Sequence, residues 1–170
     1  MTRRDRLAAV VARELRTLVR TRSLLAVVAG FALVVVGVAT GAVGAPGGYV
    51  SLTLDLLTAV EVLVPVLAFG LVYRSVRGDA ERSELAVIRT YPVSRAEYVL
   101  GVFAGRALGV VGVVVATLGA AGLLASFGKP MGAGVLATHS AGDSPVVFVR
   151  FVALAALYAV AVSAGLVAAS

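Results

Sequence analysis

The sequence has no cysteine and a single histidine, His139, among its 170 residues. Without cysteine the chain has no disulfide framework, thiolate metal site or cysteine nucleophile, and one imidazole is too few for a histidine metal cage. Charged residues are also scarce, at 14% of the chain against about 25% in soluble domains. Because 60% of the residues are hydrophobic and the mean hydropathy is +1.02, the composition excludes a soluble globular fold.

Predominantly apolar runs long enough to cross a membrane occur four times. The first is the clearest, because no charged residue lies between Ser23 and Leu54. Twenty helical residues rise about 30 Å, the thickness of the hydrocarbon core, and a helix satisfies its own backbone there. We therefore expect an all-α fold, a polytopic membrane bundle of about four transmembrane helices. The transmembrane domain is expected at 23–170, with spans at about 24–43, 52–73, 100–126 and 146–169.

Basic residues are distributed unequally over the connections between these spans. Thirteen of the fifteen lie in the tail at 1–22 or in the segment 74–106, and only Lys129 and Arg150 belong to the other side. Basic loops stay on the cytoplasmic side of a membrane, so we expect a multi-pass protein of a prokaryotic cell membrane with a cytoplasmic N-terminus. The net charge of +6 then reflects topology in the lipid bilayer, and no nucleic-acid partner is expected.

The tail at 1–22 has the pattern of an amphipathic helix. On a helical wheel one side carries apolar residues and the opposite side carries arginines: Leu7, Val11, Leu15 and Leu18 against Arg6, Arg13, Arg16 and Arg20. Such a helix lies in the headgroup region with its basic face toward anionic lipid and cytoplasm. Two interpretations remain open, an anchor with no other task and an interfacial helix that also contacts a cytoplasmic partner.

The connection after the second span is a cytoplasmic loop at 74–99 with a mixed-charge segment. Gly78 is expected to end the span and Asp79 to cap a short helix that reaches about Thr90. This helix would carry charges of both signs beside an apolar pair: Glu81, Arg82, Glu84 and Arg89, with Leu85 and Ile88. The segment is interpreted either as a solvated loop stiffened for its own stability or as a docking element that transmits force from a soluble partner.

The same loop ends in a turn and a helix cap. Pro92 forbids continuation of the preceding helix. Ser94 and Glu97 have the spacing of a capping box, in which each side chain accepts from the other's backbone amide. We therefore expect a new helix to begin near Arg95 and to continue directly into the third span.

The run ERSELAVIRTYPVSRAEYVLGVFAGR resembles the cytoplasmic loop of ATP-binding-cassette type-2 transporter permeases, especially their NosY-like branch. The positions that match the family's pattern are Pro92, Ser94, Arg95, Gly101, Gly105 and Arg106. The opening VARELRTLVRTRSLL also resembles the family's pre-membrane helix. The sequence departs from the pattern at Val102, where many members have lysine.

The resemblance implies a membrane-spanning permease subunit that couples ATP hydrolysis by a partner ATPase to substrate movement. No cofactor is expected in the chain, because ATP would be bound by the partner subunit. A second permease copy is also implied, in a homodimer or a heterodimer. Family members typically have six spans, so the chain is expected to be an N-terminal fragment or a shortened homologue. The alternative is a non-transporting membrane scaffold or anchor, or an inactive permease fragment.

Glu61 is the polar residue expected deepest in the membrane, about 12 Å below the outer surface. Its charge would cost on the order of 3 kcal/mol at the centre of a span. It is interpreted as a polar point on a substrate path, as part of a permease–permease contact, or as a neutral side chain hydrogen-bonded within the bundle. Pro65, one turn further on, is expected to bend the span and to free a backbone carbonyl nearby. No second catalytic group accompanies Glu61, so no catalytic or metal site is predicted.

Glycines recur every four residues in the third span, at Gly101, Gly105 and Gly109, and in the first span at Gly37 and Gly41. This spacing allows helix backbones to approach closely in lipid. Contacts within one chain are the expected use, and a homodimer seam is the alternative.

Overall fold

The computed structural model describes residues 11–13, 16, 20–42, 48–81, 95–127 and 144–168, with residues 42, 72–81 and 95–99 described in their backbone alone. Four long helices account for most of this part: α2 (Arg22–Ala42), α3 (Gly48–Glu81), α5 (Arg95–Ser126) and α6 (Pro145–Ala168). No strand occurs in the described residues. The predicted fold class, an all-α polytopic bundle, is confirmed.

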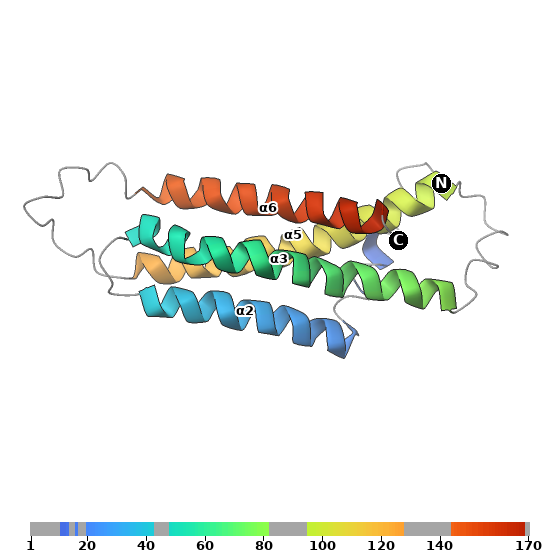
Figure 1. The fold of residues 1–170 in the computed structure, drawn as a ribbon, viewed down its shortest axis with the longest axis horizontal. Helices are drawn as coiled ribbons and strands as arrows, with labels where there is room; N and C mark the ends of the chain where they lie inside the picture. Colours follow the sequence, from blue (N-terminus) through green and yellow to red (C-terminus); the bar gives the residue numbers. More distant parts are fainter. Residues whose placement is uncertain are drawn as a thin grey trace, which may run out of the picture.

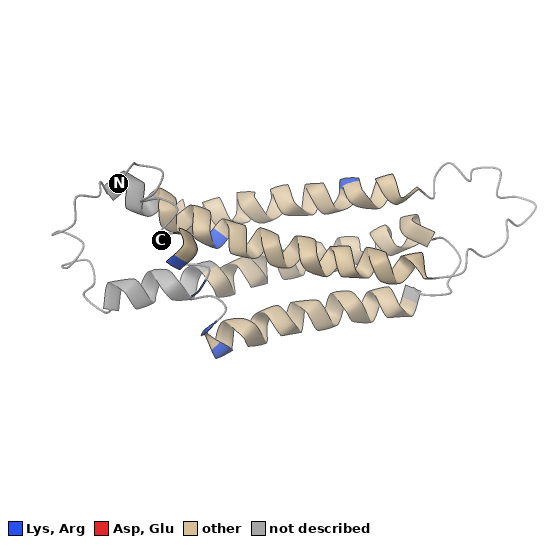
Figure 2. Cartoon of the chain, turned by 180° about the vertical axis from the view of Figure 1, so that it is seen from behind, with Lys and Arg blue, Asp and Glu red and all other residues tan. Residues whose placement is uncertain are grey.

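The four helices run alternately up and down along one common direction (Figure 1). α3 and α5 each pack against the other three helices, whereas α2 and α6 lie on opposite sides of this central pair. The start of α2, the end of α3, the start of α5 and the end of α6 lie together at one end of the bundle. Arg22 is the first residue of α2 and Arg20 precedes it, so both belong to this end, which is called the basic end below. Arg150 is five residues after the start of α6 and so lies toward the other end; basic residues are blue in Figure 2.

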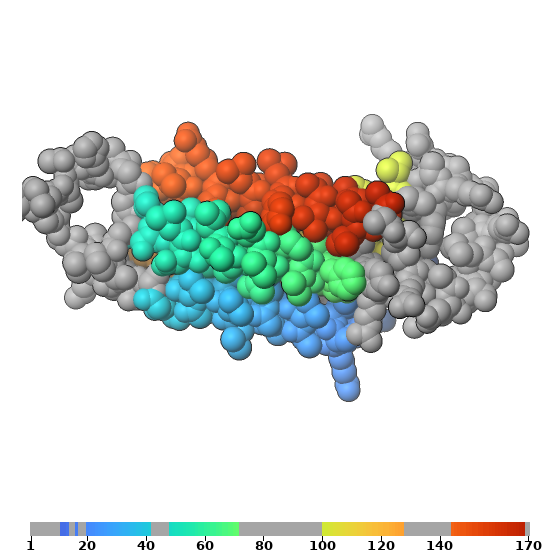
Figure 3. All heavy atoms as spheres, in the orientation of Figure 1, coloured from blue at the N-terminus to red at the C-terminus, as the bar shows by residue number. Residues whose placement is uncertain are grey.

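The bundle has apolar side chains both inside and outside. In α2, for example, Leu24, Phe31, Val35 and Ala39 recur at helical spacing and are buried. The outer faces are equally apolar, because Leu33, Leu123 and Leu157 are each at least 66% exposed. Figure 3 shows one face of the bundle, on which the side chains of α2, α3 and α6 lie side by side. An outer surface as apolar as the interior is suited to contact with lipid, and in water it would cause aggregation.

All four helices are long and apolar enough to cross a membrane. The apolar portions are Arg22–Gly41, Gly48–Leu71, Leu100–Ser126 and Pro145–Ala168. Each overlaps one of the ranges expected from the sequence. α3 begins four residues earlier than expected, at Gly48, whose φ of 51° is a left-handed conformation that glycine adopts without steric cost.

The expected helix break at Gly78 is wrong. α3 continues through Gly78 and Asp79 to Glu81, so its backbone projects ten residues beyond Leu71, or about 15 Å. A glycine inside a helix costs only about 1 kcal/mol relative to alanine, which a long preformed helix tolerates. At the far side of the loop α5 begins at Arg95, the residue where the capping pattern places it.

Candidate functional site

Glu61 lies near the middle of its membrane-spanning helix. It is thirteen residues after Gly48 and ten before Leu71, or about 20 Å from one end of the span and about 15 Å from the other. This depth is greater than the expected 12 Å because α3 starts earlier than the sequence pattern indicated. A charged residue at this depth is costly and is a functional-site candidate by default.

Tyr158 of α6 forms a hydrogen bond with this part of α3. The Tyr158 hydroxyl donates a hydrogen bond of 3.2 Å to the backbone carbonyl oxygen of Glu61. In an α-helix that carbonyl would accept from the amide four residues later, but residue 65 is proline and has no N–H. The Tyr158 hydroxyl therefore replaces the N–H donor that Pro65 lacks. Inside a membrane, a carbonyl without a donor costs several kcal/mol of free energy.

The Glu61 side chain lies on the exposed face of α3. Leu57 and Thr58, one turn earlier on the same helix, are also exposed, Leu57 to 52%. Within the described residues the carboxyl group is thus outside the bundle interior, which does not favour the interpretation of a hydrogen bond inside this bundle. A contact with another protein surface or a place on a substrate path remains the prediction for this residue.

At the basic end Arg106 is almost completely buried, with 1% of its side chain exposed. From the sequence, Arg106 was counted among the basic residues of the cytoplasmic segment 74–106. A buried guanidinium requires polar partners, so Arg106 belongs to the packing of the bundle and does not face water. The helical spacing of apolar residues could have indicated this burial, because Val102 and Val110, one turn before and one turn after Arg106, are also buried.

The glycines of the predicted pattern take different positions. Gly101 and Gly105 are buried in the bundle and Gly109 lines a groove beside α2, and their role in packing remains a prediction. At Gly37 and Gly41 an added Cβ would meet nothing within 4 Å, so the pattern in α2 marks no close contact with the described part of the chain.

Two isolated glycines, which the sequence pattern did not single out, make close contacts with neighbouring helices in the described part of the chain. An added Cβ at Gly122 of α5 would lie 2.5 Å from Cε1 of Phe148 in α6, and one at Gly70 of α3 would lie 3.2 Å from Cγ1 of Val27 in α2. No sequence signal identifies them, because each depends on the side chain that a neighbouring helix presents.

The predicted coupling loop is described only at its edges. Glu81 is the last residue of α3 and Arg95 is the first of α5. The remaining candidate residues lie outside the described part of the chain: Arg82, Glu84, Leu85, Ile88, Arg89, Pro92 and Ser94. Both flanking helices extend past their apolar portions toward this loop, so a force applied to the loop would reach the spans through continuous helix.

Across the described ranges no group of three acidic or histidine side chains is placed to hold a metal ion. Polar side chains occur singly among long apolar stretches: in the described residues Arg106, Thr117 and Ser163 are buried, whereas Glu61 and Tyr158 are exposed. This arrangement, with four candidate spans, defines a multi-pass membrane protein of helical type.

Two curated proteins are similar to the chain. It is 36% identical over 104 residues to the probable ABC transporter permease protein NosY of Pseudomonas aeruginosa, and 32% identical over 104 residues to the protein of the same name from Stutzerimonas stutzeri. Each comparison covers 58% of this chain and 38% of the relative. The chain thus spans well under half the length of the curated relatives it matches, and no family model matches it.

Proposed function

We propose that the chain forms membrane-spanning helices of a permease subunit in an ATP-driven transporter of the type-2 ATP-binding-cassette class, in a prokaryotic plasma membrane with its basic end in the cytoplasm. The observation that carries the proposal is the similarity to two permeases of ABC transporters in a chain with four candidate spans. The subunit itself binds no ATP. It acts together with a second permease copy and a separate ATPase subunit.

The loop at 74–99 is the proposed docking element for that ATPase. Leu85 and Ile88 supply an apolar contact, and the surrounding charges set the register of docking: Glu81, Arg82, Glu84 and Arg89. The turn at Pro92 and the cap at Ser94 and Arg95 then pass the movement to α5. The helical projections of α3 to Glu81 and of α5 from Arg95 support this role, because helix transmits displacement with little loss.

Mass spectrometry of proteins recovered with the tagged, natively expressed chain in mild detergent tests the proposal. We expect an ATP-binding-cassette ATPase to be recovered with the chain. The double variant Glu84→Arg/Arg89→Glu should lose it, because two of the four charges of the docking surface are reversed.

The matched control is Lys129→Glu/Asp143→Lys, which reverses one charge of each sign on the opposite side of the membrane and should retain the ATPase. Recovery of the chain without any ATPase would support the scaffold alternative and remove the transport proposal. Unchanged recovery with the loop variant would leave the permease class intact and disprove the docking role.

A further inference from the structure

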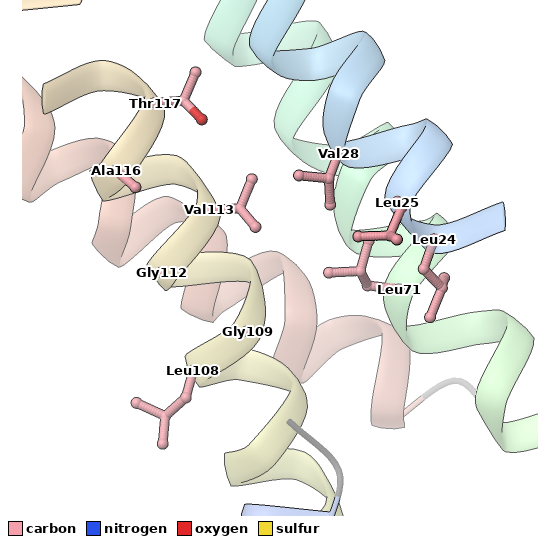
Figure 4. A pocket seen from close by; sticks show the side chains of 10 residues that line it. All are labelled: Leu24, Leu25, Val28, Leu71, Leu108, Gly109, Gly112, Val113, Ala116 and Thr117. Carbon is pink, nitrogen blue, oxygen red and sulfur yellow. The ribbon is translucent and has the colours of Figure 1, made fainter. Parts of the chain in front are cut away.

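A groove lies between α2 and α5 at the basic end of the bundle. Its volume is about 410 Å³, within the range of sites that hold small molecules. Ten residues of the described part of the chain line it, from three helices (Figure 4): Leu24, Leu25, Val28, Leu71, Leu108, Gly109, Gly112, Val113, Ala116 and Thr117. Among these ten residues Thr117 alone has a polar side chain, so this lining suits hydrocarbon.

Small residues on α5 create this groove. Gly109, Gly112 and Ala116 lie at spacings of three and four residues on one face, and an added Cβ at Gly112 would meet nothing within 4 Å. The groove is open to the outside, because Leu25 is 46% and Leu108 is 54% exposed. Along α5 the lining extends from Leu108 to Thr117, or about 13 Å.

The shape of the groove favours a chain-like occupant over a protein helix. It extends over about 13 Å along α5, and most of its lining belongs to α2 and α5, which also contact each other directly. A helix is about 10 Å across even with small side chains and would not enter between two packed helices. A single acyl chain does fit between them, and the surrounding bilayer supplies it.

The charge beside the groove favours an anionic headgroup. Arg22 opens α2 two residues before Leu24, and Arg20 precedes it; both side chains are exposed. No acidic residue occurs between positions 20 and 42. Basic pockets at the end of transmembrane helices attract anionic lipid headgroups, with about 1 kcal/mol for each arginine near the surface.

We propose that the groove binds one acyl chain of an anionic phospholipid whose phosphate is held by Arg20 and Arg22. The hydrocarbon chain lies between α2 and α5, against Val28 and Val113, and the headgroup stays at the basic end. The site is independent of transport and of any ATPase. Its occupant fills a void that the small residues of α5 leave in the bundle.

Photolabelling of the full chain in lipid nanodiscs tests the proposal. The probes are phosphatidylglycerol and phosphatidylcholine with the same diazirine-bearing acyl chain, and mass spectrometry locates the labelled residues. We expect labels at 24–28 and 108–117, with phosphatidylglycerol favoured by at least about fivefold. Equal labelling by the two lipids, or labels spread evenly over all four helices, would overturn the proposal.

Two glycines on the same face of α5 give a matched pair for the acyl chain. Gly112 lines the groove, and Gly119, two turns away, does not; an added Cβ meets nothing within 4 Å at either. Gly112→Leu should reduce labelling of the groove at least fivefold, whereas Gly119→Leu should retain it. If Gly112→Leu does not fold, Ala116→Leu is a second variant whose larger side chain would occupy the groove. Undiminished labelling in a folded filled variant contradicts the site.

A second matched pair tests the headgroup. Arg20→Gln/Arg22→Gln should lower the preference for phosphatidylglycerol at least about fivefold. Arg150→Gln, which removes an exposed arginine at the opposite end, should leave the preference unchanged. A preference that survives the double variant, or crosslinks from the groove to protein in place of lipid, would refute the assignment.

Discussion

α5 meets its neighbours in two contrasting ways. Toward α6, at the end away from the basic end, Gly122 allows the ring of Phe148 to approach within van der Waals distance of the helix backbone. Toward α2, at the basic end, Gly112 faces empty space in a groove of about 410 Å³. The same residue type therefore creates a tight contact at one place and a void at another, depending on what the opposite helix presents.

The side chain across the contact explains this difference. Phe148 is a large ring, 5% exposed, and it packs between the rings of Tyr49 and Phe151 with centroid distances of 6.0 and 5.9 Å. Across the groove, α2 presents Leu24, Leu25 and Val28, which are too short to fill the space beside Gly112. Glycine spacing alone is thus a weak guide to close packing in a membrane.

The largest expected effect is at the tight contact. Gly122→Ala should lower the free energy of unfolding by about 1–3 kcal/mol, the usual cost of overpacking, because Phe148 is held by two other rings. Steric trapping in bicelles measures this free energy. Gly119→Ala on the same helix is the control. Phe148→Leu should recover most of the loss, and a loss that persists in this double variant would place its cause elsewhere.

The next effect concerns the carbonyl freed by Pro65. Tyr158→Phe should cost about 1 kcal/mol, in the upper part of the range for hydrogen bonds between membrane helices, because the Glu61 carbonyl then has no donor. In a Pro65→Ala background, the backbone amide of residue 65 is available to that carbonyl. The cost of Tyr158→Phe should fall to near zero there. An equal cost in both backgrounds, measured by the same steric trapping, would show that Pro65 does not create the need for Tyr158.

A smaller effect is expected where α3 meets α2. Gly70→Ala should cost about 0.5 kcal/mol, because the new Cβ would lie 3.2 Å from Cγ1 of Val27 and that half-buried side chain must shift by a few tenths of an ångström. A double-mutant cycle with Val27→Ala tests the contact. The two changes should couple, and strict additivity of their unfolding free energies would disprove it.

The smallest effect is expected in the groove. Gly112→Ala should change the free energy of unfolding by no more than a few tenths of a kcal/mol, because its Cβ meets nothing and the span remains helical even when the bundle separates. Thermal unfolding in detergent, compared with Gly122→Ala in the same preparation, measures the contrast. A loss at Gly112 as large as that at Gly122 would abolish the distinction between the two contacts.

Much of the architecture follows from the sequence. The four spans and the concentration of arginines at one end can be read from residues alone, because the bilayer demands a minimum apolar length and a backbone that satisfies itself. The start of α5 at Arg95 agrees with the capping pattern in the sequence. The error at Gly78 shows the limit of such signals, because a glycine ends a helix only if the chain beyond it takes another path.

Other features depend on neighbours that are distant in sequence. Pro65 indicated a freed carbonyl, that of Glu61, yet its donor, Tyr158, is 97 residues further along the chain, on α6. The outward position of Glu61, the burial of Arg106 and the contact of Gly122 likewise result from how four nearly uniform helices rotate against one another. When every face of a helix is apolar, periodicity does not specify which face turns inward. Side-chain packing between the helices then selects the rotation, and that information exists only in the assembled bundle.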